Sequence, residues 1–267
     1  MSLDDRALGC VLGALVGDAA GATLEFLGHL PSPRECDRAL TLPGGGILGV
    51  APGQITDDGE LTLCLAQALA TSPRFNLTTI IQHYLRWYDS HPFEIGQTTA
   101  TALRAYQRVK SEDYPRIIAE VVAPACSESK ANGSVMRATP LAVWGYDLGD
   151  EELARYAIAD SAITHPHPSC GYGVACYCLA IAHLLKNDGD SLGAFQRAEQ
   201  WLNIPKSHPS AQQEVLSWLN DAQNNHNIPY SPHIGFIKIA LTHAFRHLLH
   251  CQSYLEAIQK TLPIMFS

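Results

Sequence analysis

Two adjacent carboxylates and a hydroxyl stand at the entrance to an apolar helical stretch. Thr56, Asp57 and Asp58 lie in the segment Gln54-Ile-Thr-Asp-Asp-Gly-Glu-Leu-Thr-Leu. Consecutive oxygen ligands in a loop suit a hard cation such as Mg²⁺, which takes near-octahedral oxygen coordination. The same residues also suit an ordinary helix start, because Thr or Asp caps free N–H groups and acids are favoured by the helix dipole. A metal site and a capped helix therefore both remain open.

Three other segments offer polar groups that could share a site with this one. Glu25 follows the small-residue stretch Gly17-Asp-Ala-Ala-Gly-Ala-Thr-Leu, so its long carboxylate could reach back. Asn132 to Ser134 form a polar turn before an apolar helix, where free backbone N–H groups either bind an anion or sugar or are simply capped. His165 and His167 stand beside prolines; we expect His165 to face inward and His167 to lie in a surface loop.

Elements that would position these residues are helices, because apolar residues recur by threes and fours and strand-like alternation is rare. Leu8–Ala22 and Pro168–Lys186 read as small-residue or buried helices, and similar stripes follow Asp58 and Ile237. We predict one compact all-α domain over residues 1–267, with more than ten helices. The breaker-rich loops are Leu30–Pro33, Pro43–Gly53, Asn203–Pro209 and Asn224–Pro232.

Composition limits the partners and the compartment. The net charge of −8 comes from 26 acids and 18 bases without a basic stripe, so nucleic acid is not an expected partner. Eight cysteines contain no CxxC pair and sit mostly in apolar stretches, which predicts reduced core thiols. We identify neither a signal peptide nor an apolar run long enough to span a bilayer, and expect a cytoplasmic protein with no membrane contact.

In their order along the chain, the segments resemble the ADP-ribosylglycohydrolase family, whose fold is also called dinitrogenase-reductase-activating glycohydrolase-like. The resemblance runs from about residue 5 to the end. It depends on the GDxxG helix followed by Glu25-Phe26, TDDGE at 56–60, Phe93-Glu-Ile-Gly-Gln-Thr-Thr, NGSVMR at 132–137 and the SAITHPHP turn. It implies a helical hydrolase with two Mg²⁺ ions in a cleft, which removes ADP-ribose from modified protein side chains or related small ADP-ribosyl compounds.

The resemblance also implies which residues form the site. The metal ligands would be Glu25, Thr56, Asp57 and Asp58. The catalytic residues would be Glu25, Asp57 and Asp58, with Glu25 as the acid/base. Asp18 would support these carboxylates. The pocket for the ribose or diphosphate would contain Gly96, Asn132, Gly133, Ser134 and His165.

One motif of the family is not matched. Members carry a GDTDT-like segment that adds aspartates to the metal pair, whereas this sequence has no carboxylate after Glu256. Two divalent ions about 4 Å apart repel by roughly 17 kcal/mol at an effective dielectric near 20. Glu25, Asp57 and Asp58 bring only −3 against +4, so we expect a chain truncated at the C-terminus that holds one weakly bound Mg²⁺.

Two functions follow from this difference. The first is an ADP-ribosyl hydrolase with impaired activity. The second is a catalytically inactive module that binds ADP-ribose or another protein. Apolar surface left uncovered by the unmatched segment would favour self-association, and we expect either a monomer or weak self-association.

Overall fold

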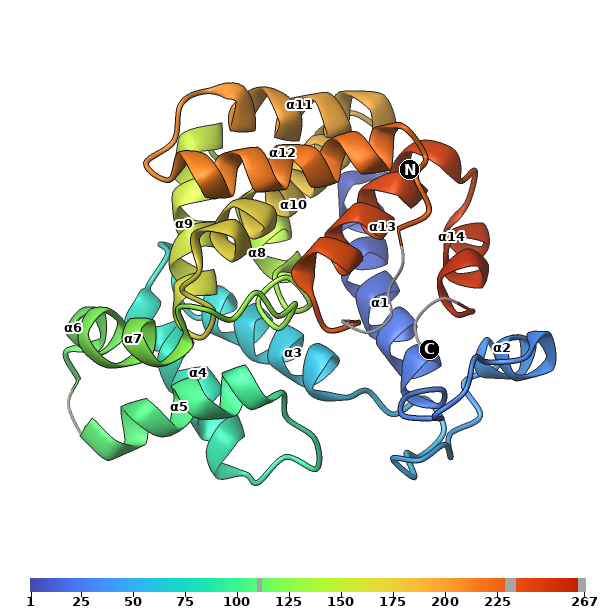
Figure 1. Ribbon diagram of the computed structural model, residues 1–267, viewed down its shortest axis with the longest axis horizontal. Helices are drawn as coiled ribbons and strands as arrows, with labels where there is room; N and C mark the ends of the chain where they lie inside the picture. Colours follow the sequence, from blue (N-terminus) through green and yellow to red (C-terminus); the bar gives the residue numbers. More distant parts are fainter. Residues whose placement is uncertain (110–111, 229–233, 264–267) are drawn as a thin grey trace.

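The computed structural model describes residues 1–109, 112–228 and 234–263. Within these ranges the chain forms fourteen α-helices, a five-residue π-helix and no strand, with isolated bridges pairing Gly45 with Val50 and Ala131 with Phe236 (Figure 1). The elements are α1 (Leu3–Ala22), α2 (Pro33–Ala39), α3 (Asp57–Ala70), α4 (Leu77–Asp89), α5 (Gln97–Val109), α6 (Tyr114–Ile117), η1 (Ile118–Val122), α7 (Ala123–Cys126), α8 (Thr139–Trp144), α9 (Asp150–Ala162), α10 (Pro168–Lys186), α11 (Ser191–Asn203), α12 (Pro209–Gln223), α13 (Ile237–His250) and α14 (Tyr254–Thr261). The predicted all-α class, with more than ten helices, is confirmed.

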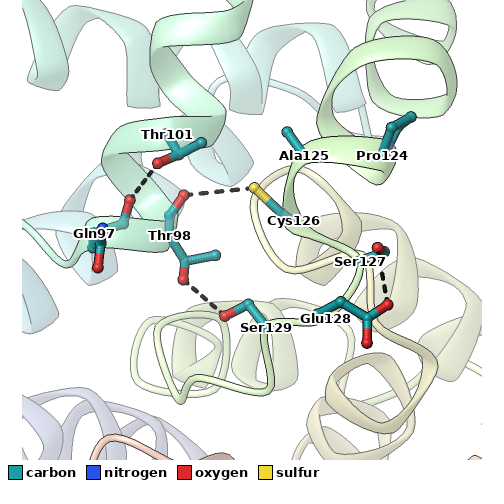
Figure 2. Close-up of a pocket in the computed structure, with 9 residues that line it drawn as sticks. All are labelled: Gln97, Thr98, Thr101, Pro124, Ala125, Cys126, Ser127, Glu128 and Ser129. Carbon is teal, nitrogen blue, oxygen red and sulfur yellow. Dashed lines mark hydrogen bonds between the residues drawn. The ribbon is translucent and has the colours of Figure 1, made fainter.

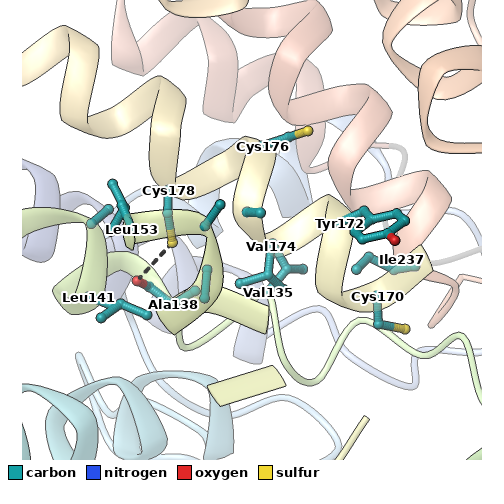
Figure 3. Packing of buried hydrophobic residues seen from close by; sticks show 14 of the residues in the cluster. Val135, Ala138, Leu141, Leu153, Cys170, Tyr172, Val174, Cys176, Cys178 and Ile237 are labelled. Carbon is teal, nitrogen blue, oxygen red and sulfur yellow. Dashed lines mark hydrogen bonds between the residues drawn. The ribbon is translucent and has the colours of Figure 1, made fainter. Parts of the chain in front are cut away.

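Helix α10 forms the centre of the core, and it begins and ends where its apolar spacing predicts. It packs against α8, α9, α11 and α12, and its side chains Cys170, Val174 and Cys178 are completely buried. Figure 3 shows these residues against Val135 and the start of α8. A helix that is apolar on all sides needs neighbours on all sides, which this position provides.

The length and hydropathy of α10 correct one expectation. By length and composition alone this helix could cross a membrane, contrary to the prediction that no apolar run is long enough. Its most apolar window is 78% buried inside the described fold, as in a core helix.

Several boundaries differ from those predicted. Helix α1 starts at Leu3 because the side chains of Ser2 and Asp5 form a capping box there. Pro33, predicted to lie in a loop, is the first residue of α2. The turn after Asn132 continues to Ala138 before α8 begins, so Asn132 to Ser134 are not directly at a helix start. Of the loop predicted at 224–232, residues 229–232 lie outside the described residues.

The cysteines behave as predicted from their spacing. All eight are free, and five of them are buried. Helix α3, which starts at Asp57, packs against α1, α4 and α8, and in Figure 1 its first turn lies beside the last turns of α1. This arrangement places Asp57 and Asp58 near the segment that contains Glu25.

Candidate functional site

The first turn of α3 is capped by a carboxylate from α1. Asp18 accepts hydrogen bonds from the backbone N–H groups of Thr56 (2.9 Å) and Gly59 (2.8 Å), and from the Thr56 hydroxyl (2.7 Å). Thr56 occupies the N-cap position, yet its side chain makes no capping bond. The helix start is therefore satisfied from outside, and neither Asp57 nor Asp58 is needed as its cap.

Asp57 connects this helix start to the loop before α5. Its Oδ2 accepts a hydrogen bond from the backbone N–H of Gly96 (3.0 Å). The side chain is buried, and burial raises the pKa of its carboxyl despite that hydrogen bond; the nearby charges of Asp18 and Glu60 raise it further. The predicted metal ligand and the predicted substrate-binding glycine are thus direct neighbours.

Glu25 and Glu94 form a carboxyl pair beside Asp57. Burial, followed by the charges of Glu94 and Asp57, raises the pKa of Glu25 to about 8. Burial and the charge of Asp57 raise the pKa of Glu94 to about 7, and the two carboxyl groups interact directly. Two carboxyl groups in contact favour one shared proton over two charges.

Asp58 belongs to the same group of acids. Burial raises the pKa of its carboxyl well above its usual range, and the charges of Asp57, Asp18 and Glu25 raise it further. Electrostatic interactions thus connect the predicted Glu25, Asp57 and Asp58 with Asp18, predicted as their support, and with Glu94. We call these five side chains the acidic cluster.

Glu94 is the residue that the sequence did not single out. It stands in the matched segment Phe93-Glu-Ile-Gly, two positions before Gly96. This position, two residues before the predicted substrate-binding Gly96, is the feature of the sequence that could have identified Glu94 as a site residue. Its Oε2 atom is buried and has no hydrogen-bond partner among the described residues.

Gly133 and His165 lie together on the other side of Thr99. A Cβ atom placed on Gly133 would stand 2.7 Å from Cε1 of His165 and 3.2 Å from the Thr99 hydroxyl oxygen. A Cβ on Gly96 would lie 4.0 Å from that same oxygen and from Oδ2 of Asp57. Thr99 therefore links the acidic cluster to the NGS turn, residues 132–134, and only glycine fits the close approach at position 133.

The other two residues of the NGS turn differ in accessibility. Ser134 is completely buried, and its hydroxyl oxygen accepts a hydrogen bond from Ser161 (3.0 Å). Asn132 is partly exposed, and its backbone N–H donates to the carbonyl of Gly235 (2.8 Å). Within the described ranges, the backbone N–H groups of Gly133 and Ser134 and the side-chain amide of Asn132 have no hydrogen-bond partner.

A buried ion pair supports the NGS turn and His165 from behind. Arg137 lies 3.2 Å from Asp160, which also accepts a hydrogen bond from the Tyr84 hydroxyl (2.8 Å). Arg137 donates to the hydroxyl of Thr164, which is 2.8 Å from Nδ1 of His165. Burial and then the charge of Arg137 lower the pKa of His165 to about 3, so this imidazole is neutral.

A polar hollow of about 220 Å³ opens beside Gly96 at the start of α5. Figure 2 shows that hydroxyl groups from two elements meet in it, where Thr98 and Ser129 are 2.7 Å apart. Its lining consists of Gln97, Thr98, Thr101 and residues 124–129. A second hollow, of about 360 Å³, is lined by Lys130, Ala131, Gly235 and Phe236. Both hollows are lined by residues of the segment that leads into the NGS turn.

The order of these features along the chain matches a known family. Residues 1–263 match the family model described as ADP-ribosylglycohydrolase. The chain belongs to the ADP-ribosylglycohydrolase family. The resemblance identified from the motifs is therefore confirmed.

Individual relatives agree with this assignment. The chain is 34% identical over 194 residues to an ADP-ribosyl-dinitrogen reductase glycohydrolase of Rhodospirillum rubrum, covering 70% of this chain and 60% of that protein. It is 33% identical over 198 residues to an ADP-ribosylarginine hydrolase of Pseudomonas putida, covering 70% and 48%. The alignments thus span less than two thirds of either relative.

A solved structure supports the fold of the family. A chain of a structure named ADP-ribosylglycohydrolase-related protein complex superimposes with a TM-score of 0.75 at 23% identity. The match covers 98% of this chain and 82% of that chain. At this identity the likeness concerns the all-α architecture.

The acidic cluster has the donor chemistry of a site for a hard cation. Its ligands are oxygens, its charges repel one another, and Glu94 carries an unpartnered buried oxygen. Across the part of the chain that the structure describes, no three His, Cys, Asp or Glu side chains stand close enough together to hold a metal ion. The residue types fit Mg²⁺, and binding would require at least three of the carboxylates to move closer together.

Proposed function

We propose that the protein is a magnesium-dependent hydrolase that removes ADP-ribose from a modified protein side chain or a related small ADP-ribosyl compound. The observation that carries this proposal is the direct connection of the acidic cluster to the NGS turn through Gly96 and Thr99. A site of this family needs two parts. The acidic cluster would bind the ion and face the reacting bond, and the NGS turn would bind the nucleotide. The family assignment and the names of the relatives support the reaction class.

The NGS turn supplies hydrogen-bond donors for the anionic part of the substrate. The N–H groups of Gly133 and Ser134 and the amide of Asn132 have no partner in the described structure, and such groups bind phosphate oxygens well. Ser134 contributes through its backbone, because its hydroxyl is buried against Ser161. His165, neutral and fixed by Thr164, offers its second nitrogen without adding charge.

The acidic cluster would hold the ion and handle the proton. Thr56, Asp57, Asp58 and Glu25 supply the oxygen ligands, with Asp18 fixing the orientation of Thr56. Bound Mg²⁺ would hold the ribose hydroxyls and lower the pKa of a water molecule near the anomeric carbon. Glu25 is the proposed acid/base, because a pKa raised to about 8 lets a carboxyl group carry a proton near neutral pH.

Glu94 changes the number of carboxyl groups on which the expected number of ions depended. The expectation of one weakly held ion counted three carboxylates, whereas five carboxyl groups here influence one another electrostatically. With all five deprotonated, their summed charge of −5 would exceed the +4 of two magnesium ions. We therefore propose a divalent-cation site without restricting it to one ion.

A binding module without catalysis is the second candidate. One observation favours it: no preformed three-ligand group is found among the described residues. Both candidates predict ADP-ribose binding, and only the first predicts magnesium-dependent release.

Product release decides between them. The purified chain would be incubated with an arginine-linked and a serine-linked ADP-ribosyl peptide, with Mg²⁺ or with EDTA, and free ADP-ribose would be measured. The hydrolase proposal expects release with Mg²⁺, loss with EDTA, and loss in the Asp57→Asn variant. Titration calorimetry with ADP-ribose supports the binding module if heat is released while neither peptide is cleaved.

A further inference from the structure

His165 stands at the end of a chain of buried hydrogen bonds that begins at Arg137. The Arg137 side chain is completely buried, and its Nε donates to Oδ2 of Asp160 (3.2 Å). Oδ1 of the same carboxylate accepts from the Tyr84 hydroxyl (2.8 Å), so both carboxylate oxygens are engaged. Arg137 acts only as a donor in this chain, because a charged guanidinium has no acceptor atom.

The hydroxyl of Thr164 lies between Arg137 and His165. Its oxygen accepts a hydrogen bond from Nη1 of Arg137 (2.8 Å) and is 2.8 Å from Nδ1 of His165. Thr164 is completely buried, and its hydroxyl hydrogen has no other acceptor in the part of the chain that the structure describes. Because a buried O–H group needs an acceptor, the Thr164 hydroxyl donates to Nδ1.

This hydrogen bond decides which nitrogen of the His165 ring carries the proton. Burial, followed by the charge of Arg137, lowers the pKa of the imidazole to about 3, so the ring has a single N–H at neutral pH. Since Nδ1 accepts from Thr164, the proton must be on Nε2, and we call this the Nε2–H form. Nε2 has no hydrogen-bond partner among the described residues, so the ring presents an unused donor.

The unused donor of His165 faces the NGS turn. A Cβ atom placed on Gly133 would stand 3.1 Å from Nε2, so glycine at this position leaves the nitrogen clear. Arg137 also donates to the carbonyl of Gly133 (3.2 Å), which ties the turn and the ring to the same guanidinium. The backbone N–H of Gly133 is a second donor without a partner in the described ranges. Neighbouring donors suit phosphate oxygens, which only accept, better than a sugar hydroxyl, which also donates.

We propose that Arg137 and Thr164 are positioning residues that hold His165 in the Nε2–H form, in which its ring donates a hydrogen bond to a diphosphate oxygen of ADP-ribose. The buried Arg137–Asp160 pair thereby sets the direction of a hydrogen bond at the ligand, in addition to supporting the fold. The identity of the ligand rests on the proposed function. The form of the ring is a property of the protein without ligand, so the two parts can be tested separately.

The form of the ring is measured first, in the protein without ligand. Long-range proton–nitrogen correlation spectra of protein with isotope-labelled histidine separate protonated from unprotonated ring nitrogens. Signals absent from a His165→Gln variant identify those of His165. Thr164→Val removes the hydroxyl and Thr164→Ser keeps it. Thr139→Val is the matched control, because it also removes a buried threonine hydroxyl, which is 2.8 Å from the Tyr177 hydroxyl.

We expect His165 to be protonated on Nε2 and not on Nδ1 in the wild type, in Thr164→Ser and in Thr139→Val. Thr164→Val should show a mixture of both forms, because neither form then has a partner at Nδ1. Added ADP should shift the wild-type Nε2–H signal. In calorimetry, Thr164→Val should weaken both ADP-ribose and ADP by about two- to tenfold, and the other two variants by less than about twofold.

Four results would count against these expectations. A wild-type ring protonated on Nδ1 overturns the assignment, whether or not any variant folds. A Thr164→Val ring that stays entirely in the Nε2–H form shows that the threonine does not fix it. Weaker binding of ADP-ribose with unchanged binding of ADP refutes the diphosphate as the acceptor. If the wild type binds neither nucleotide, the proposed function fails, while the spectra still confirm or refute the form of the ring.

Discussion

The carboxylate of Asp18 accepts hydrogen bonds from both the backbone N–H and the hydroxyl of Thr56, at 2.9 and 2.7 Å. One side chain of α1 therefore fixes the start of α3 and the direction of the Thr56 hydroxyl hydrogen, leaving the oxygen lone pairs free to face a cation. The same carboxylate also accepts the N–H of Gly59. With both oxygens engaged, Asp18 acts as a support for the site.

Removing this support should weaken both the fold and the metal site. Asp18→Asn replaces one acceptor oxygen by an NH₂ group, which cannot accept from Thr56 or Gly59. We expect a loss of about 0.5–2 kcal/mol in the free energy of unfolding, as for other lost caps, and a weaker Mg²⁺ affinity. Denaturant unfolding and calorimetry measure the two effects. Asp37→Asn, an exposed acid on α2, should change neither.

Gly59 should not tolerate a side chain, although alanine favours helices. A Cβ at this position would stand 2.5 Å from Oδ2 of Asp18 and 2.7 Å from Cβ of Ile55. We expect Gly59→Ala to destabilise the protein by about 1–3 kcal/mol, because the crowded neighbours must move.

Gly9→Ala is the matched control within α1. Nothing lies within 4 Å of its Cβ position, so the higher helix propensity of alanine should stabilise the protein by about 0.5–1 kcal/mol. The prediction is confirmed if Gly59→Ala lowers the melting temperature and Gly9→Ala raises it. If both variants are stabilised, the close contact between Asp18 and Gly59 is contradicted.

Asp57 and Asn132 should separate metal binding from ligand binding. Asp57→Asn keeps an acceptor for the Gly96 N–H and removes the charge, so Mg²⁺ binding should be lost with little change in stability. Asn132→Ala leaves the acidic cluster intact and should weaken only ADP-ribose, by about 1 kcal/mol for one hydrogen bond. Calorimetric titration of each variant with each ligand tests this, and loss of both ligands in either variant would contradict it.

The helices could be predicted from the sequence, because the spacing of apolar residues along a buried helix face is visible within a short stretch of chain. Pro168–Lys186 is the clearest case, since its apolar spacing and opening proline set both ends. Asp57, Asp58 and Gly133 could likewise be selected, because their residue types and order carry the family resemblance. The sequence does not show that Thr99 lies between these aspartates and Gly133. This follows only from the fold, which brings α5 and the NGS turn together.

The sequence does not reveal which side chains far apart in the chain interact in the fold. The cap of α3 comes from Asp18, 38 positions before Thr56, and local capping rules favour the helix's own threonine. Glu94 interacts with Glu25 only because the fold brings the loop before α5 to the turn that follows α1. We expected Ser134 to line a pocket, and its hydroxyl is buried against Ser161; helical periodicity does not reveal which side of a turn faces the core.

The Glu25–Glu94 pair should make the metal-free protein less stable as pH rises. Their pKa values of about 8 and about 7 lie above the ordinary value of 4.5, so the folded protein holds protons that the unfolded chain releases. The free energy of unfolding then falls with increasing pH from about 4.5 to about 8. His165 titrates in the opposite sense below about 6.5, which makes pH 6.5 to 8.5 the informative range.

Thermal unfolding in EDTA across that range should show a falling melting temperature for the wild type. Glu25→Gln removes one of the two titrating groups and leaves Glu94 with a neutral neighbour, so its melting temperature should depend less on pH. Added Mg²⁺ should raise the wild-type melting temperature most at pH 8.5, because a cation favours the deprotonated carboxylates and needs to displace fewer protons there. A wild-type melting temperature that rises with pH in EDTA, or a slope unchanged by Glu25→Gln, would show that the two carboxyl groups do not share a proton.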